Sequence, residues 1–134
     1  MVRLFVALAL PDTIRDQLTG ICAGLPGARW VPPENLHLTL RFIGELDPND
    51  ILDIDDALSH ISADAFEIRL DTIGFFGKGR AIRALWIKTA RSPELAVLHA
   101  NVESAMVRAG CAPENRKFLP HVTLARFRRA QSDL

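Results

Sequence analysis

Cysteine is scarce in this chain. Among its 134 residues only Cys22 and Cys111 are cysteines, and they lie far apart in the sequence. Two isolated cysteines do not make the disulfide framework that small extracellular domains use. The sequence therefore predicts reduced thiols in the core of a cytoplasmic protein.

Long hydrophobic runs are also missing. The apolar run from Leu4 to Leu10 ends at Pro11 and is too short to span a bilayer. It has no basic leader and no small-residue cleavage site, which a secretory signal would require. We therefore expect neither secretion nor a membrane partner.

Several sequence motifs of well-known enzymes are absent. No G-x-S-x-G elbow is present, so Ser-His-Asp hydrolysis is poorly supported. The glycine-rich stretch 74–79 lacks the G-x-x-x-x-G-K-[ST] pattern and is predicted as a hairpin loop. Few Asp or Glu residues accompany the histidines, so the sequence predicts no metal site and no cofactor.

Net charge is zero, with 16 basic and 16 acidic residues, but the C-terminal segment is basic. The basic residues there are Arg116, Lys117, Arg126, Arg128 and Arg129. Arginine forms bidentate contacts with phosphate, so this segment favours an anionic substrate. An arginine-rich proteome would give the same bias without functional meaning, and the two interpretations have equal weight.

The pattern of apolar residues predicts a single domain over residues 1–134 with an α+β fold. Predicted strands cover residues 3–10, 29–31, 35–43, 65–73, 81–89 and 121–127, and predicted helices start near Asp12, Asp47 and Ser92. The strand over 3–10 is apolar on both faces, which is typical of a central strand. We expect a bilobed, pseudo-twofold arrangement of antiparallel sheets, with helices packed outside and a central cleft.

The phrase His-x-Thr occurs twice, at His37–Thr39 and at His121–Thr123. Residues two apart in a strand point to the same side, so each His projects with its Thr. An imidazole titrates near pH 6.5, so one His can be neutral while the other is protonated. Such a pair can take a proton from water and give one to a leaving oxygen at phosphorus, while the Thr hydroxyls bind the phosphate oxygens.

These residues and their flanks carry a family resemblance. The segments 35–45 (NLHLTLRFIGE) and 120–126 (PHVTLAR) resemble the paired H-x-[ST]-x signature of the 2H phosphoesterase superfamily. The similarity is greater to its RNA 2′,3′-cyclic phosphodiesterase branch, also known as 2′-5′ RNA ligases, and it extends over nearly the whole chain. The resemblance implies metal-independent hydrolysis of RNA 2′,3′-cyclic phosphate ends or cyclic nucleotides to 2′-phosphates.

The resemblance also implies residue roles. His37 would act as the acid on the leaving 3′ oxygen, and His121 would activate water as the base. Thr39 and Thr123 would hold the phosphate. Arg126 would contact the phosphate and Phe42 would stack on a base.

Strand alternation conflicts with the last two roles. It places Arg126 on the face opposite His121, so Arg126 reaches the phosphate only if the strand bends or ends first. It places Phe42 inward, where a core role competes evenly with base stacking. It places Arg41 on the same face as His37, although the family gives Arg41 no fixed role.

Other functions are open at this point. Members of the family usually continue past the second motif into further strands, which this chain is expected to lack. An uncovered sheet edge would favour a homo-oligomer. The alternatives to hydrolysis are reversible 2′-5′ joining of RNA ends by the same two histidines and a non-catalytic RNA-binding module.

Overall fold

A computed structural model describes residues 2–77 and 82–127 of the chain. The end of the glycine-rich stretch, the first residue of the predicted strand 81–89, and Arg128 and Arg129 lie outside this range. The α+β class is confirmed, because three α-helices accompany antiparallel strands in the described part. The chain divides into two compact units: a first unit of residues 1–7, 39–69 and 91–119, and a second unit of residues 8–38, 70–90 and 120–134.

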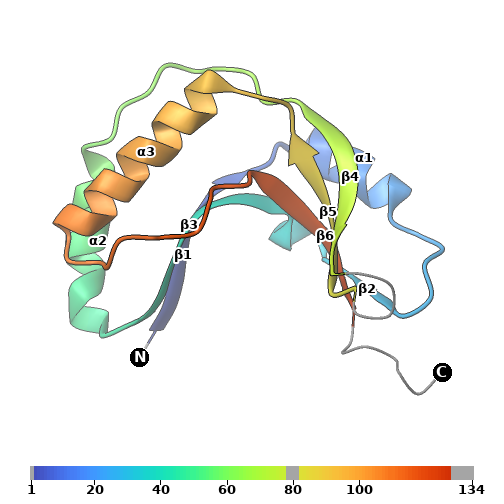
Figure 1. Cartoon of the computed structure of the whole chain (residues 1–134), viewed down its shortest axis with the longest axis horizontal. Coiled ribbons are helices and arrows are strands. Elements are labelled where there is room, and N and C mark those ends of the chain that lie inside the picture. The colour runs from blue at the N-terminus through green and yellow to red at the C-terminus, as the bar shows by residue number, and fades with distance from the viewer. Residues whose placement is uncertain (1, 78–81, 128–134) are drawn as a thin grey trace. The chain divides into compact units, whose positions relative to one another are not determined.

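In the second unit, β6 (His121–Phe127) is the central strand. The strand β5 (Ala84–Thr89) pairs along one edge of β6, and β4 (Leu70–Phe76) pairs with the far edge of β5 (Figure 1). Along its other edge β6 pairs with β2 (Ala28–Trp30) and with the start of β3 (His37–Leu46). All of these pairings are antiparallel, and β6 therefore has neighbours on both sides.

The core of the second unit is built on the strands that meet at β6. Leu38, Val122, Leu124 and Ala125 are at most 1% exposed. The helix α1 (Asp12–Ile21) buries Leu18, and the short helix η1 (Pro33–Asn35) leads into β3. Burial of these apolar side chains fixes which face of β3 and β6 is turned away from solvent.

The first unit combines two strands with two helices. The strand β1 (Val2–Ala9) pairs with β3, and α2 (Ile51–Ser59) lies beside α3 (Pro93–Arg108) (Figure 1). The short helix η2 (Pro48–Asp50) precedes α2. The predicted start of α3 near Ser92 is confirmed, and the Ser92 hydroxyl caps the helix by accepting a hydrogen bond from the Leu95 amide at 3.1 Å.

Two strand predictions were wrong. β1 is not covered on both sides: among the described strands it pairs only with β3, and Phe5 is 44% exposed. β4 runs from Leu70 to Phe76, later than the predicted 65–73, so Phe75 and Phe76 lie in a strand and not in a loop. The reason for the second error is pairing, because Phe76 stands opposite Ala84 and continues the ladder with β5.

Candidate active site

Both histidines begin strands of the second unit. His37 is the first residue of β3, His121 is the first residue of β6, and the following residues Leu38 and Val122 are antiparallel partners. In the same register, His37 lies opposite Thr123, and His121 is a diagonal neighbour of His37 on the same face. Diagonal neighbours are about 7–8 Å apart, so a phosphate has room between the two imidazoles.

Aromatic rings surround His121. The Phe76 ring meets the His121 ring edge to face, with centroids 5.2 Å apart and planes at 84°. The Trp86 ring lies 6.3 Å from His121 and 5.6 Å from Phe76. Phe76 was predicted to lie in a loop, and Trp86 was not among the predicted site residues. The register puts Trp86 opposite Thr123 and makes both rings neighbours of a predicted catalytic residue.

Gly74 leaves space for the Trp86 ring. Gly74 is the partner of Trp86 on β4, and a Cβ at Gly74 would lie 2.4 Å from Cη2 of the Trp86 ring. Such a contact is far inside van der Waals distance, so the ring lies across the strand at the one position without a side chain. The glycine at 74 therefore holds the tryptophan beside Thr123 and His121.

An irregularity in β6 decides the position of Arg126. Leu85 pairs with Ala125, but the next residue, Trp86, pairs with Thr123, so Leu124 is an extra residue in β6. A bulge of this kind shifts the alternation by one residue. Arg126 then pairs with Ala84, which has the parity of Trp86, and shares the face of Thr123 and His121. The bend that sequence alternation required of Arg126 is present.

Arg126 also acts on His37. Burial lowers the pKa of His37 below its ordinary value, and the positive charge of Arg126 lowers this pKa further, while a hydrogen bond with the Asn35 backbone opposes both effects. His37 is therefore held toward its neutral form in the ligand-free protein. An anion bound beside Arg126 would offset the repulsion and raise the pKa of His37.

The strand β3 interrupts its alternation at the corresponding place. Leu40 and Arg41 are consecutive buried residues, at 5% and 6% exposure, and Phe42 is 52% exposed. The prediction that Arg41 shares the face of His37 and that Phe42 points inward was wrong in both respects. The Phe42 ring lies 5.8 Å from the Phe5 ring within the first unit. Thr39 also belongs to the first unit and is partly exposed.

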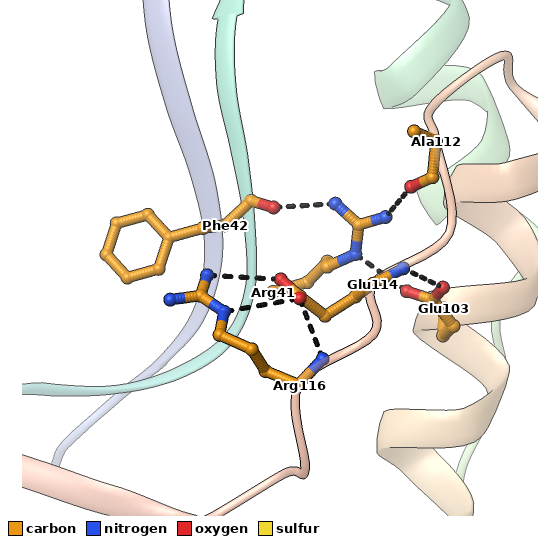
Figure 2. A network of polar contacts seen from close by, with 6 residues as sticks. All are labelled: Arg41, Phe42, Glu103, Ala112, Glu114 and Arg116. Atoms are coloured by element: carbon orange, nitrogen blue, oxygen red, sulfur yellow. Dashed lines mark hydrogen bonds and ion pairs between the residues drawn. The ribbon is translucent and has the colours of Figure 1, made fainter.

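Buried Arg41 is fully engaged in the first unit (Figure 2). Its Nε donates to Oε1 of Glu103 at 2.6 Å, and its two terminal nitrogens donate to the carbonyl oxygens of Phe42 at 2.6 Å and Ala112 at 2.5 Å. The hydrogen bond from Arg41 lowers the pKa of Glu103. One guanidinium thus ties β3, α3 and the loop after α3 together.

The loop after α3 is held by further contacts. The Glu114 amide donates to Oε2 of Glu103 at 2.9 Å, and the Glu114 carboxylate accepts hydrogen bonds from Arg116 (Figure 2). The hydrogen bonds from the side chain and the backbone of Arg116 lower the pKa of Glu114 to about 2. The rings of His99 and Phe118 stack at 3.8 Å. The loop that leads into Pro120 and β6 is therefore ordered by side chains of the first unit.

No group of three or more His, Cys, Asp or Glu residues that could hold a metal ion is found within residues 2–77 and 82–127. Within the same range, no helix has the length and apolar character needed to cross a membrane.

The paired His-x-Thr strands and the antiparallel α+β architecture define a class of protein. The family model described as LigT-like phosphoesterase matches residues 8–86 and 87–134. The chain belongs to this family, and the 2H phosphoesterase resemblance is confirmed.

Individual relatives agree with that assignment. The RNA 2′,3′-cyclic phosphodiesterase of Archaeoglobus fulgidus is 31% identical over 99% of this chain and 77% of its own length. The protein of the same name from Escherichia coli is 34% identical over 92% of this chain and 71% of its own length. The crystal structure of Escherichia coli LigT complexed with 3′-AMP has a TM-score of 0.78 at 34% identity and covers 92% of this chain and 72% of that one.

Proposed function

We propose that this protein hydrolyses RNA 2′,3′-cyclic phosphate ends to 2′-phosphates, with His37 and His121 as acid and base and without a metal. The observation that carries the proposal is the Leu38–Val122 pairing, which supports a single face bearing His37, Thr123 and His121. Relatives named RNA 2′,3′-cyclic phosphodiesterase at 31% and 34% identity support the substrate.

The proposed reaction is a displacement at phosphorus. His121 takes a proton from water as its oxygen attacks phosphorus, and the bond from phosphorus to the 3′ oxygen breaks. His37 gives a proton to the 3′ oxygen, which leaves as a hydroxyl, and the phosphate stays on the 2′ oxygen. The net change is the addition of one water molecule, and each proton transfer contributes about 10²–10⁴ to the rate.

The protonation of His37 follows from its neighbours. In the free protein, burial and Arg126 lower the pKa of His37 and favour the neutral ring. A cyclic phosphate monoanion beside Arg126 offsets that positive charge, so binding raises the pKa of His37 toward the protonated form that an acid requires. The arginine therefore has two parts in the proposal: it binds the phosphate, and it makes protonation of His37 depend on the substrate.

The other predicted contacts remain proposals. Thr123 lies on the shared face and would donate its hydroxyl hydrogen to a phosphate oxygen, a role that we also assign to Thr39. Exposed Phe42 would stack on a base. Self-association through an uncovered edge stays a prediction: among the described strands β4 pairs only with β5, and its Ile73 and Phe75 are 51% and 47% exposed. The cytoplasmic location and the single domain also stay predictions.

The test uses the purified chain in EDTA with 2′,3′-cyclic AMP and with an RNA oligonucleotide that ends in a 2′,3′-cyclic phosphate. We expect 2′-phosphate products, and we expect His37→Ala and His121→Ala each to lower kcat by about 10²–10⁴. His60→Ala is the matched control, because His60 is an exposed histidine bonded to the Asp56 carbonyl at 2.7 Å.

Four outcomes would contradict the proposal. A 3′-phosphate product would show that the 2′ oxygen, and not the 3′ oxygen, is the leaving group. Activity that is lost in EDTA and restored by a metal would remove the metal-independent mechanism. Binding of RNA without turnover, unchanged in both histidine variants, would make the chain an RNA-binding module, and a longer 2′-5′-linked product from two RNA ends would make it a ligase.

A further inference from the structure

Two arginines of the second unit stand directly opposite each other. Arg29 on β2 is the antiparallel partner of Arg126 on β6, and both side chains are exposed. Like charges on directly opposite residues of neighbouring strands destabilise a sheet. Within residues 2–77 and 82–127, neither arginine forms an ion pair with a carboxylate. The unit thus keeps an electrostatically unfavourable pair that no described carboxylate compensates.

The pair lies on the face of the candidate active site. The extra residue Leu124 turns Arg126 to the side of Thr123 and His121, and residues opposite each other in a ladder share a face, so Arg29 is on that side too. The positive charge of Arg126 lowers the pKa of His37. The backs of these strands are apolar, with Leu124 and Ala125 at most 1% exposed. The two cations therefore face the solvent on the side of the sheet that carries the histidines.

We propose that Arg29, opposite Arg126, binds a second phosphate of the substrate, the phosphodiester on the 5′ side of the nucleotide that carries the cyclic phosphate. The inference rests on the proposed function. A cyclic phosphate carries one negative charge, and one guanidinium can bind it through two hydrogen bonds. A second guanidinium beside the first is suited to a second anion, and RNA supplies one phosphate for each further nucleotide. The second guanidinium therefore favours an RNA end over a mononucleotide as the substrate.

The experiment compares three substrates for the full chain. They are a 2′,3′-cyclic mononucleotide, a dinucleotide that ends in a 2′,3′-cyclic phosphate, and the same dinucleotide with a neutral methylphosphonate linkage. The last substrate keeps the second base and removes only the negative charge, so it separates a phosphate contact from a base contact. The variants are Arg29→Gln, Arg29→Lys and the control Arg83→Gln.

Arg83 is a matched control because it lies at the same end of these strands as Arg29 and Arg126, but on the other face of the sheet. Its carbonyl accepts the Phe127 amide at 2.9 Å, and the next residue, Ala84, is the partner of Arg126, so strand alternation turns exposed Arg83 away from the site. Replacing it removes one positive charge from the same end of the same strands. An effect of net charge alone would appear equally in Arg83→Gln and Arg29→Gln.

We expect Arg29→Gln to lower kcat/KM for the phosphodiester dinucleotide by about 10- to 100-fold. It should leave the mononucleotide and the methylphosphonate dinucleotide within about twofold of the wild type, and Arg29→Lys should restore part of the loss. Arg83→Gln should leave all three substrates unchanged. The melting temperature of Arg29→Gln should equal or exceed that of the wild type, because the substitution removes a repulsion between like charges.

A binding measurement tests the pair independently of turnover. For the dinucleotide ending in a 2′-phosphate, Arg29→Gln should reduce the slope of log affinity against log salt concentration by about 0.7, the share of one phosphate contact in a single strand. Equal losses on all three substrates, no loss on any, or an unchanged slope would overturn the inference while leaving the hydrolase intact. A wild-type protein that hydrolyses none of the three substrates would instead overturn the proposed function, and the salt slope would still decide the role of Arg29.

Discussion

The strands β3 and β6 have the same sequence of buried and exposed positions, but different side chains occupy the last two positions of that sequence. In both, a partly exposed His and Thr alternate with buried apolar residues, two consecutive residues are then buried, and an exposed residue follows. The second buried residue is Arg41 in β3 and Ala125 in β6. The exposed residue is Phe42 in β3 and Arg126 in β6.

This difference shows that one interruption of the alternation can serve two purposes. In β6 the extra residue turns a cation toward the histidines, and small Ala125 occupies the buried position at no electrostatic cost. In β3 the buried position holds a guanidinium, which requires Glu103 and two carbonyl oxygens as partners. A buried charge is tolerated only with such partners, so the two strands need different surroundings.

The largest effect is expected from making β6 resemble β3. Ala125→Arg would place a guanidinium at a position that is 0% exposed, between the strand partners Trp30 and Leu85. An uncompensated buried charge costs about 3–5 kcal/mol, so we expect an unfolded or strongly destabilised protein in urea denaturation. A variant as stable as the wild type would show that this position opens to solvent.

The reverse change in β3 should have a smaller effect. Arg41→Met removes the cation and leaves Glu103, whose side chain is 24% exposed, without its partner. We expect a loss of about 2–3 kcal/mol in the free energy of unfolding at pH 7, below the value for a fully buried pair. Glu45→Gln, which affects an exposed ion pair with Arg3 at 4.0 Å, is the control and should change stability by less than about 0.5 kcal/mol.

The cost of Arg41→Met should also depend on pH. Arg41 lowers the pKa of Glu103 below 4.5, so the stabilisation from this carboxylate is fully present above that pH and is lost as the pH falls through the lowered pKa. The gap between wild type and variant should therefore narrow below pH 4.5. A gap that stays constant down to pH 2 would mean that the ion pair does not carry the effect.

An intermediate effect is expected at the aromatic rings beside His121. Gly74→Ala brings a Cβ to 2.4 Å from the Trp86 ring, which must move, and overpacking of this kind costs about 1–3 kcal/mol. Because Trp86 contacts His121 and faces Thr123, kcat should fall more than the loss of folded protein explains. Gly20→Ala, which meets no atom within 4 Å, should be neutral or slightly stabilising. Full activity per folded Gly74→Ala molecule would remove the rings from the site.

The smallest expected effect is a shift in one titration. Arg126→Gln removes the charge that lowers the pKa of His37, so that pKa should rise in the ligand-free protein. Nuclear magnetic resonance of the imidazole signals over pH 4–9 measures it, with Arg83→Gln as the control. A pKa of His37 that is unchanged by Arg126→Gln would place the guanidinium away from the ring.

Much of the site could be predicted from the sequence because the His-x-Thr phrases are local patterns. Alternation gave the correct faces of His37 and His121, and it failed only beyond Leu40 and Leu124. The interruptions carry no glycine or proline, so nothing in the neighbouring residues announces them. The faces predicted for Arg41 and Phe42 were wrong because a buried arginine needs partners from distant residues, such as Glu103, that no local pattern contains.

The residues that sequence reasoning missed are brought in by pairing between strands. Arg29, Phe76 and Trp86 reach the site because β2 and β5 pair with β6 and β4 pairs with β5. The strand β4 was placed too early, since apolar residues alternate equally well at 66–70, and only the partner strand selects residues 70–76. The spacing of Ala84, Trp86 and Lys88 was the one available signal, because it places three residues on one face of a strand next to β6.

The most direct measurement is a crystal structure of the full chain with 2′-AMP, the expected product. The predicted result is one phosphate whose oxygens lie about 3 Å from a ring nitrogen of His37, a ring nitrogen of His121 and the guanidinium of Arg126. A phosphate bound to only one of the two imidazoles, or bound on the face of Leu38 and Val122, would contradict the proposed mechanism.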